Sequence, residues 1–471
     1  MAIYPLDVVI MAAGKGTRMK SSLPKVLHRL GGRALLAHVM DCAAQLSARQ
    51  AVVITGHRAT EVEAACASRT GAAADLSLKF VRQEPQLGTG HAMQQALPEL
   101  LDDGITLVLS GDVPLTQAAT LQALLAQSGG QRLALLTLTM SDPTGYGRIV
   151  RADAASDQVR MIVEHKDATD AERCITEIYS GIMAVPTRLL RRWLARLDND
   201  NAQKEFYLTD IVKFAAADGV AVVAHQITDA AQVAGVNSPV QLAELERIHQ
   251  RRLANVLMEQ GVRLADPARL DQRGTLICGQ DVEIDVNCVF DGNVTLGNGA
   301  RVGANCVIAN ATIAADVVIA PFTHIDGETL GVTVGEGALI GPFARLRPGA
   351  ALGPEVHIGN FVEVKNSTLA RGAKANHLAY LGDATVGERV NFGAGSITAN
   401  YDGAAKHRTV IEADAHIGSN CVLVAPVLIG AGTTVGGGST ITKSTPAGGL
   451  AVARARQVSL PKWQRPAKRS P

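Results

Sequence analysis

Features that would tie the protein to a membrane, an oxidising compartment or nucleic acid are absent from the sequence. It has no run of 18 uninterrupted apolar residues and no charged segment before an apolar one at its start, which disfavours membrane insertion and export. Its seven cysteines form no CxxC pair, which is typical of reduced thiols and not of a disulfide or zinc framework. A formal charge of +1 provides no basic field for nucleic acid. We therefore expect a cytoplasmic protein that binds no nucleic acid.

Aromatic residues are also scarce, at 3% of the chain, whereas apolar residues make up 47% and charged residues 19%. These proportions describe a folded protein whose interior is filled mainly by Val, Ile, Leu and Ala. At 471 residues the chain is too long for one ordinary core, so two or three domains are expected.

The second half of the chain has a period of six residues from about Val282 to Ile441. Apolar residues recur at this spacing in two runs: Val334, Ile340, Leu346, Leu352, Ile358, Val364, and then Ile417, Leu423, Ile429, Val435, Ile441. A period of six fits neither one face of an α-helix nor a plain strand. It is typical of a chain that coils with three short flat faces. At about 18 residues for each coil, the repeat predicts roughly eight coils.

Residues 6–227 have a different pattern, in which short apolar runs alternate with segments of helical period. The strand-like runs are Leu6–Met11, Ala51–Thr55, Leu78–Gln83, Ile105–Ser110 and Arg132–Met140, and helices are expected near 34–47, 58–68, 88–98 and 117–127. This alternation predicts a mostly parallel sheet with helices on both faces. Ligands then bind at the carboxyl ends of the strands.

A helix start separates the two halves. In Ser238-Pro-Val-Gln241, serine is a good N-cap, proline suits the first turn, and glutamine completes a capping box. Gly261 can end this helix. We therefore expect an α/β domain over 1–237, a linker helix over 238–261, coils over 262–450 and a basic tail over 451–471.

A glycine turn follows the first strand, in the segment Met11-Ala-Ala-Gly-Lys-Gly-Thr-Arg-Met19. Its two glycines allow backbone N–H groups to approach an anion. The segment fails both the GxGxxG motif and the Walker A spacing, so taken alone it is equally well a tight turn. Its neighbours favour a binding site, because Pro24-Lys25 lies just downstream and Leu87–Gly90 and Gly111–Pro114 follow later strands.

Together, Gly-x-Gly-Thr-Arg-Met, Pro-Lys and Gly-Asp-x-Pro resemble the motifs of sugar-phosphate nucleotidyltransferases over about the first 235 residues. Nucleotidyl transfer requires cations around the triphosphate, which Arg18 and Lys25 can supply, and a metal ion, which Asp112 can hold. The nucleophile would be a sugar phosphate, whose second pKa of ~6 leaves it ionised at pH 7 without a general base. Asp112 could also serve only as a turn residue before a proline.

The hexads are interrupted by the polar segment Ala375–Asp383 and by Thr398–Arg408, which we expect to loop out. Other polar residues near these segments in the sequence are Arg345, Arg347, Glu363, Lys365, Asn391 and Asn400–Asp402. A lone histidine in such a repeat is more often structural. Here His377 occurs among basic residues on successive coils, which favours an anionic substrate and a general base.

Arg-Leu-Arg-Pro-Gly, Gly-Asn-Phe-Val-Glu-Val-Lys, His-Leu-x-Tyr-Leu-Gly-Asp and Asn-Tyr-Asp-Gly resemble one half of a bacterial family. This family is the bifunctional N-acetylglucosamine-1-phosphate uridyltransferase/glucosamine-1-phosphate acetyltransferases, and both halves match in order. The resemblance implies a Rossmann-like α/β domain, a left-handed parallel β-helix, a homotrimer, and acetyl-CoA bound between neighbouring β-helices. It also implies acetyl transfer from acetyl-CoA to glucosamine 1-phosphate, followed by uridylyl transfer from UTP to N-acetylglucosamine 1-phosphate with release of pyrophosphate.

The resemblance implies a set of residues for the uridylyl site. Arg18 and Lys25 would act on the phosphates, and Asp112 and Asn237 would bind Mg²⁺. The nucleotide and the sugar would contact Met11, Ala12, Ala13, Gly14, Gln83, Gly88, Thr89, Gly111, Gly147 and Glu164.

The resemblance likewise implies an acetyl site. Arg347 and Lys365 would bind the sugar phosphate, and His377 would deprotonate the amine, because an amine must lose its proton to attack a thioester. Tyr380 and Asn391 would position the amine. Acetyl-CoA would contact Ala394, Asn400, Tyr401, Ser419 and Arg454. We also expect Glu363 to orient His377.

Three residues depart from the family pattern. Ser110 and Tyr179 stand where Tyr and Asn are usual near the nucleotide and the sugar, so we expect Tyr179 to change a sugar contact. Gly437 replaces a common Ala near the acetyl-CoA site.

Two other functions stay open from the sequence. In one, the coils of a single-activity nucleotidyltransferase only regulate or oligomerise, which leaves the polar residues around His377 unexplained. In the other, the protein is a non-catalytic assembly factor, against which the intact Lys25, Asp112 and Asn237 count.

Overall fold

The computed structural model describes residues 4–67, 73–153 and 157–466. The chain divides into two compact units, Met1–His249 and Gln250–Pro471, and each has its own hydrophobic core. No helix in the described part of the chain is both long and apolar enough to cross a bilayer.

The first unit is built on one sheet of mostly parallel strands, which confirms the predicted α/β class. Its main strand order is β11-β7-β10-β6-β1-β4-β5, and β8 and β9 extend it beside β10. The strands are β1 (Leu6–Met11), β4 (Gln50–Thr55), β5 (Leu78–Arg82), β6 (Ile105–Ser110), β7 (Leu133–Thr139), β8 (Arg148–Arg151), β9 (Val159–Val163), β10 (Glu177–Pro186) and β11 (Val222–Ile227). Strand β10 runs antiparallel to both of its neighbours.

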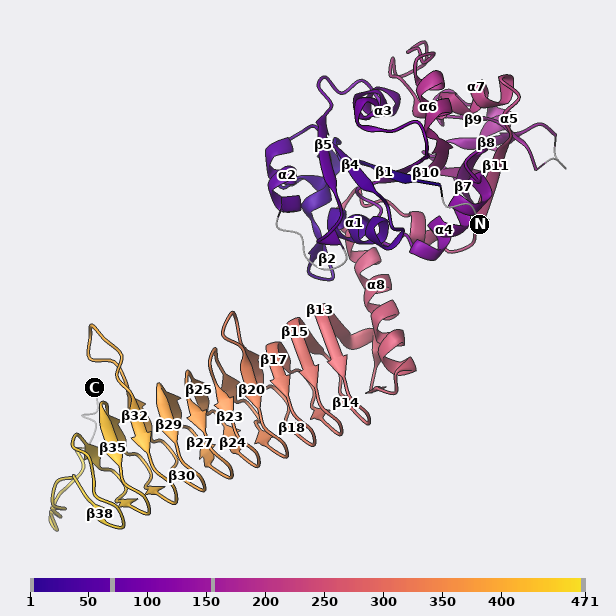
Figure 1. Ribbon diagram of the computed structural model, residues 1–471. Coiled ribbons are helices and arrows are strands. Elements are labelled where there is room, and N and C mark those ends of the chain that lie inside the picture. The colour runs from indigo at the N-terminus through magenta and orange to yellow at the C-terminus, as the bar shows by residue number, and fades with distance from the viewer. Residues whose placement is uncertain (1–3, 68–72, 154–156, 467–471) are drawn as a thin grey trace, which may run out of the picture. The chain divides into compact units, whose positions relative to one another are not determined.

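Helices cover both faces of this sheet (Figure 1). Alternate residues of β1 point to opposite faces, so Val8 and Ile10 join one core and Val9 joins the other. The first core is completed by α1 (Leu35–Gln45), α2 (Ala59–Ala67) and α4 (Ala118–Ser128), and the second by α3 (Thr89–Ala96), α6 (Thr187–Leu194) and α7 (Ile211–Ala217). Each fully buried Val, Leu or Ile contributes roughly 1.5–3 kcal/mol to stability, which explains why this alternation sets the layers.

Short elements complete the first unit. They are β2 (Arg29–Leu30), β3 (Arg33–Ala34), α5 (Asp170–Arg173), and the 3-10 turns at Thr17–Met19, Lys25–Leu27, Leu97–Glu99, Leu208–Asp210 and Ala230–Val233. Helix α8 (Pro239–Glu259) begins where the sequence predicts, with the Gln241 N–H donating to Ser238 Oγ at 3.3 Å. The Gln241 side chain accepts from the Asn237 N–H at 2.8 Å, one residue earlier than a capping box requires.

The second unit is a parallel β-helix with three faces. Face one consists of β12 (Arg263–Leu264), β14 (Glu283–Ile284), β16 (Arg301–Val302), β18 (Val318–Ile319), β21 (Leu339–Ile340), β24 (His357–Asn360), β27 (Lys374–His377), β30 (Asn391–Phe392), β33 (His416–Ile417), β36 (Thr434–Val435) and β38 (Leu450–Ala451). Face two consists of β19 (His324–Asp326), β22 (Arg345–Leu346), β25 (Glu363–Lys365), β28 (Tyr380–Gly382), β31 (Ile397–Ala399), β34 (Val422–Val424) and β37 (Thr440–Ile441).

Face three consists of β20 (Val332–Val334), β23 (Ala351–Leu352), β26 (Thr368–Leu369), β29 (Ala384–Val386), β32 (Thr409–Ile411) and β35 (Val427–Ile429). Three longer strands, β13 (Leu270–Cys278), β15 (Cys288–Leu296) and β17 (Val307–Ile313), precede these on faces two and three. The two ends of β17 pair with different strands, β19 and β20, so this strand contributes to both faces.

The coils number more than the hexads predict. Within the described residues, face one has eleven strands, from Arg263 to Ala451, so the expectation of roughly eight coils is wrong. The reason is that the coils near Arg263 and Ala451 lie outside the recognisable repeat. Parallel backbone pairing continues there without the apolar-glycine hexads.

Apolar residues of successive coils stack inside the β-helix. Ile340 and Ile358 are register partners and both are 1% exposed. The glycine that follows such a residue permits close stacking, since a Cβ on Gly335 would lie 2.4 Å from the carbonyl carbon of Gly353.

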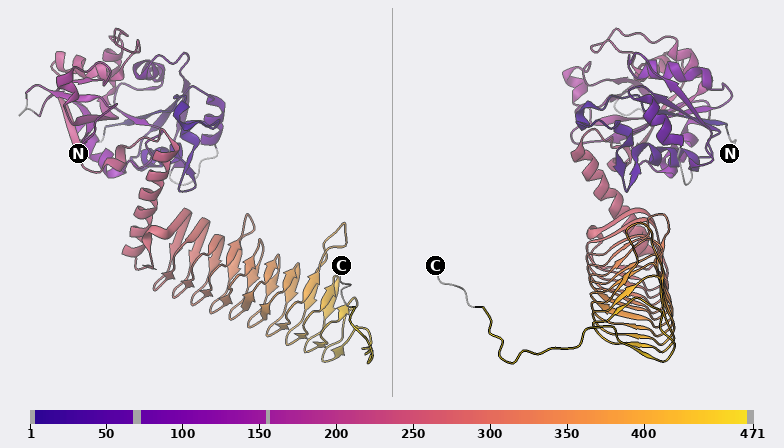
Figure 2. Two further views of the ribbon diagram at one scale, coloured as in Figure 1. Left: turned by 180° about the vertical axis from the view of Figure 1, so that it is seen from behind. Right: turned by 90° about the vertical axis from the view of Figure 1, so that its left-hand side faces the viewer.

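Two loops project from the stack, one beside β20 and one beside β32 (Figure 1). They are residues 327–331 and 400–408, and the second confirms the predicted break except that Thr398 and Ala399 still belong to β31. Beyond Arg454 the described tail is exposed and runs away from the coils (Figure 2).

Candidate active sites

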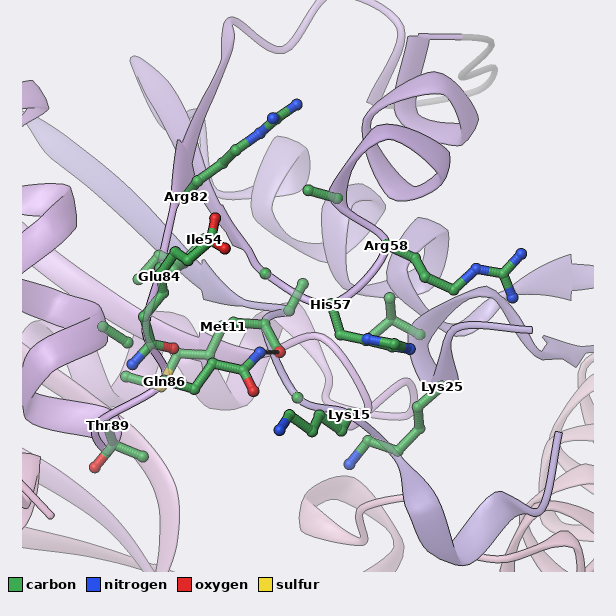
Figure 3. A pocket seen from close by; sticks show the side chains of 18 of the residues that line it. Met11, Lys15, Lys25, Ile54, His57, Arg58, Arg82, Glu84, Gln86 and Thr89 are labelled. Atoms are coloured by element: carbon green, nitrogen blue, oxygen red, sulfur yellow. Dashed lines mark hydrogen bonds between the residues drawn. The ribbon is translucent and has the colours of Figure 1, made fainter. Parts of the chain in front are cut away.

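A cavity of about 1050 Å³ opens at the carboxyl ends of four parallel strands in the first unit. It is lined by residues that end or follow β1, β4, β5 and β6, as the topology predicts. Figure 3 shows Lys15 and Lys25 on one side of this cavity and Gln86 and Thr89 on the other. Among the predicted residues, the cavity lining includes Met11, Ala12, Ala13, Gly14, Lys25, Gln83, Gly88, Thr89 and Asp112.

The loop after β5 is held in one conformation. The Gln83 amide donates to the Gly88 carbonyl at 2.8 Å, and the Leu208 N–H donates to Thr89 Oγ1 at 3.1 Å. Gly88 has φ +104°, and a Cβ there would lie 2.6 Å from the Phe206 carbonyl oxygen, so only glycine fits. At Gly14, by contrast, no described atom lies within 4 Å of a Cβ position, which leaves its backbone open to a ligand.

Basic and oxygen-bearing side chains meet where the cavity joins a second pocket of about 310 Å³. Lys25 Nζ donates to Asp112 Oδ2 at 2.5 Å and to Asn237 Oδ1 at 3.2 Å. Arg18 Nη2 donates to the same Asn237 oxygen at 2.9 Å. The bond from the Asn237 N–H to Gln241 ties this residue to the start of α8. One ammonium group therefore contacts both predicted metal ligands.

The donor set suits Mg²⁺. Asp112 and Asn237 offer one carboxylate and one amide oxygen, the hard ligands that this ion prefers, and few protein ligands are usual where phosphates complete the shell. Among the described residues, no group of three or more His, Cys, Asp or Glu side chains is placed to bind a metal. The two oxygens therefore fit an ion that is bound largely through substrate and water.

Two predicted sugar contacts lie together beside these pockets. A Cβ on Gly147 would lie 3.7 Å from both Glu164 carboxylate oxygens. Thr209 Oγ1 donates to Glu164 Oε1 at 2.9 Å, and burial raises the pKa of Glu164. Gly111 follows β6, and its N–H donates to the Met11 carbonyl at 2.9 Å.

We expected Tyr179 to change a sugar contact, and this stays a prediction: burial and the nearby carboxylate of Glu164, a predicted sugar contact, raise the pKa of Tyr179. Its side chain packs in the core with Ile162 and Met183, and its buried hydroxyl has no partner among the described residues. The next residue, Ser180, lines the smaller pocket instead. The cause is the alternation of side chains along β10, which turns residue 179 inward. Ser110 lines both pockets.

In the second unit, one corner edge carries several predicted acetyl-site residues. This first edge lies between faces one and two and contains His377, Ala394 and Ser419 on successive coils. Each of their carbonyl oxygens accepts a hydrogen bond from a backbone N–H of the next coil. The donors are Gly395, Asn420 and Gly438, in the same order. Arg454 Nη1 donates to the Gly437 carbonyl at 2.7 Å, which brings the tail to the same edge. His377, Ala394, Ser419 and Arg454 are far apart in the sequence and thus meet along the same edge of the β-helix.

Asn360, and not Glu363, orients His377. His377 Nδ1 lies 2.9 Å from Asn360 Oδ1, and the two residues are register partners on adjacent coils. An amide oxygen can only accept, so Nδ1 donates the hydrogen of this bond, and in the neutral imidazole the lone pair is then on Nε2. The prediction for Glu363 is wrong because Glu363 is on face two, where its carboxylate accepts from Arg347 Nη1 at 2.7 Å.

The second edge, between faces two and three, carries Arg347 and Lys365. The Lys406 side chain from the projecting loop lies beside Lys365 and, together with burial, lowers the pKa of Lys365. Sequence reasoning missed Lys406, although a lysine inside the break in the hexads was a signal. Three basic side chains therefore gather at this edge.

The remaining predicted residues have varied surroundings. Tyr380 is the register partner of Glu363 on face two, and the Asn391 amide lies 3.2 Å from His416 Nδ1. Tyr401 is 62% exposed on the loop. Asn400, predicted to contact acetyl-CoA, is buried, and its amide donates to Asp383 Oδ2.

Comparisons with known proteins identify both units. The model of the MobA-like NTP transferase domain matches residues 8–178, and that of the bacterial transferase hexapeptide, with six repeats, matches residues 331–366 and 408–443. A protein of Polaromonas naphthalenivorans named "Bifunctional protein GlmU" is 86% identical over 470 residues, covering 100% of this chain and 99% of its own. A protein with the same name from Polaromonas sp. (strain JS666) is 81% identical, covering 98% of this chain and 98% of its own. Another from Herminiimonas arsenicoxydans is 55% identical, covering 98% of this chain and 99% of its own.

These matches extend over both units, so they account for the second half of the chain as well as the first. They favour the bifunctional enzyme over a single-activity nucleotidyltransferase and over a non-catalytic assembly factor. The chain belongs to the GlmU family of bifunctional enzymes, which carry out acetyl transfer and uridylyl transfer in the synthesis of UDP-N-acetylglucosamine.

Proposed function

We propose that the cavity of the first unit performs uridylyl transfer and that the edges of the β-helix around His377 perform acetyl transfer. The contact of Lys25 with both Asp112 and Asn237 carries the first assignment. The free Nε2 of His377, on the edge that also holds Ala394 and Ser419, carries the second. UTP and acetyl-CoA are intracellular metabolites, which supports a cytoplasmic location.

In the uridylyl site, a phosphate oxygen of N-acetylglucosamine 1-phosphate attacks the α-phosphorus of UTP. A new P–O bond forms, the bond to the β-phosphate breaks, and pyrophosphate leaves. Arg18 and Lys25 neutralise charge on the triphosphate, and the glycine turn at Gly14 offers backbone N–H groups to it. Asp112 and Asn237 would hold Mg²⁺, which supplies further charge neutralisation on the phosphates.

In the acetyl site, the amine of glucosamine 1-phosphate attacks the thioester carbonyl of acetyl-CoA. His377 Nε2 takes the amine proton, an N–C bond forms, and the C–S bond breaks to release CoA. Arg347 and Lys365 bind the sugar phosphate, while Tyr380 and Asn391 position the amine. Ala394, Tyr401, Ser419 and Arg454 contact acetyl-CoA, and Asn400 acts by shaping the loop that carries Tyr401.

The spacing of the two edges supports a homotrimer. Lys365 is the register partner of Gly382, and Gly382 is five positions after His377, a span of up to roughly 16 Å of extended chain. The amine and the phosphate of glucosamine 1-phosphate are on adjacent carbon atoms. A phosphate site on one chain and a base on its neighbour would meet one substrate where two β-helices pack side by side. We therefore assign the acetyl site to the interface between chains.

Two variants test the assignment of the sites. Asp112→Ala is expected to lower uridylyl transfer at least ~100-fold and to leave acetyl transfer unchanged, since a metal ligand is worth several kcal/mol to the transition state. His377→Ala is expected to lower acetyl transfer by ~10²–10⁴-fold and to spare uridylyl transfer, as for loss of a general base. Pyrophosphate release and free CoA thiol report the two reactions. Near wild-type acetyl transfer by His377→Ala would refute the second site.

A further inference from the structure

Asp383 is a buried carboxylate at the second edge of the β-helix that neither proposed reaction uses. It is 6% exposed, and burial of a charge is costly unless its oxygens are hydrogen-bonded. Its Oδ1 accepts from the Asn366 amide at 2.5 Å, and its Oδ2 accepts from the Asn400 amide. Both oxygens of this carboxylate therefore have an amide partner, and the two bonds tie Asn366 and Asn400 to it.

The bonds of Asp383 converge on the base of the projecting loop. Asn400 is the first residue of this loop. Thr409 follows the last residue of the loop, and its N–H donates to the Asp383 carbonyl at 3.1 Å. The Asp383 N–H in turn donates to the Lys365 carbonyl at 3.1 Å. One residue therefore joins both ends of the loop to the coil that carries Lys365.

The loop itself is held together internally. The His407 N–H donates to the Asn400 carbonyl at 2.8 Å, and Tyr401 forms a β-bridge with Lys406. Asp402 Oδ1 accepts from two main-chain N–H groups of the loop at 2.8 and 2.7 Å, and its Oδ2 contacts His407 Nε2 at 2.6 Å. A loop with these bonds moves as one piece, so its attachment at the base sets where Lys406 and Tyr401 point.

The attachment of the loop determines the position of Lys406 relative to Lys365. Lys406 lies beside Lys365, and two ammonium groups at close range repel each other unless an anion is bound between them. We propose that Asp383 is a positioning residue that fixes the loop so that Lys406 and Lys365 together bind the phosphate of the sugar substrate. This inference rests on the acetyl site proposed above.

A carboxylate is required at this position because both of its partners are amide donors. Asparagine at position 383 would offer one acceptor oxygen and one NH₂ group, so a donor would face either Asn366 or Asn400. Asp383→Asn preserves the size of the side chain, removes the negative charge from both bonds, and leaves one of the two partner amides facing an NH₂ group. Asp414→Asn is the matched control, because Asp414 also has positive φ at a coil corner before an alanine but bonds to Arg389.

The first measurement is the steady-state kinetics of acetyl transfer by the full-length protein. Asp383→Asn is expected to raise the KM for glucosamine 1-phosphate ~10-fold, as for one lost charge-assisted hydrogen bond, while uridylyl transfer by the same preparation stays within twofold of wild type. Asp414→Asn is expected to change neither. If Asp383→Asn fails to fold, Asn400→Ala cuts the same bond from the loop side and is judged by the same result.

A double-mutant cycle separates positioning from a loss of stability. Lys406→Met is expected to raise the same KM in the wild-type background and to have little further effect in the Asp383→Asn background, because the lysine is already displaced. The proposal would be overturned if the KM of the double variant rose by the product of the two single fold-changes. It would also be overturned if the KM of Asp383→Asn were the same as that of Asp414→Asn. Absence of acetyl transfer in the wild-type protein would instead refute the proposed function.

Discussion

At the scale of single side chains, the role proposed for a residue depends on its hydrogen-bond partner. The base proposed at His377 has its Nδ1 beside an amide oxygen, and Asn237, which accepts from Lys25, has its backbone N–H bonded to Gln241. The types of these residues were predictable from the motifs. Asn360 was not, since it lies 17 residues from His377 and meets it only through the register of adjacent coils.

Asn360→Ala tests this orientation. Loss of one orienting hydrogen bond, worth about 1 kcal/mol, is expected to lower kcat for acetyl transfer about fivefold to tenfold with little change in KM for acetyl-CoA. Uridylyl transfer by the same protein serves as the internal control. An unchanged kcat would show that the imidazole needs no partner at Nδ1.

For strands and coils, local periodicity carries much of the information. Hexads predict the faces of the β-helix, and alternating runs predict five strands of the first sheet. Other strands were missed, among them β10, whose antiparallel place between β6 and β7 depends on pairing with both. Pairing of this kind is a property of the assembled sheet, because short apolar runs fit several neighbours equally well.

Gly335→Ala tests the close stacking of coils. Because a Cβ would lie 2.4 Å from the carbonyl carbon of Gly353, the substitution forces a backbone shift and is expected to lower the free energy of unfolding of the β-helix by ~1–3 kcal/mol. Gly437→Ala is the control, since its Cβ would have its nearest neighbour at 3.3 Å. Urea titration followed by circular dichroism measures the free energy of unfolding of both variants. Equal values for Gly335→Ala and Gly437→Ala would contradict the packing argument.

For the whole molecule, the placement of His377 and Lys365 on different edges has the largest consequence. The acetyl site that we propose between chains would make acetyl transfer depend on assembly, whereas the cavity proposed for uridylyl transfer is lined by residues of one chain. The proposed trimer therefore predicts that the two activities respond differently to mixing of variants.

Co-expression of His377→Ala and Arg347→Ala chains tests the shared site. If base and phosphate site come from neighbouring chains, random mixing leaves both intact in one site of four, so about 25% of wild-type acetyl transfer is expected. Each variant alone should be nearly inactive. Mixed trimers no more active than the single variants would place the whole site within one chain.

Motifs and periods identified two units, two sets of reactive residues and a break in the hexads, because each of these is written in short stretches of sequence. The register between coils, the inward turn of Tyr179, the pairing of His377 with Asn360 and the anchoring of the loop by Asp383 were settled by folding. The direction of Tyr179 depends on how β10 packs in its sheet, and the other three features join residues that are distant in the sequence and that pairing of successive coils brings together.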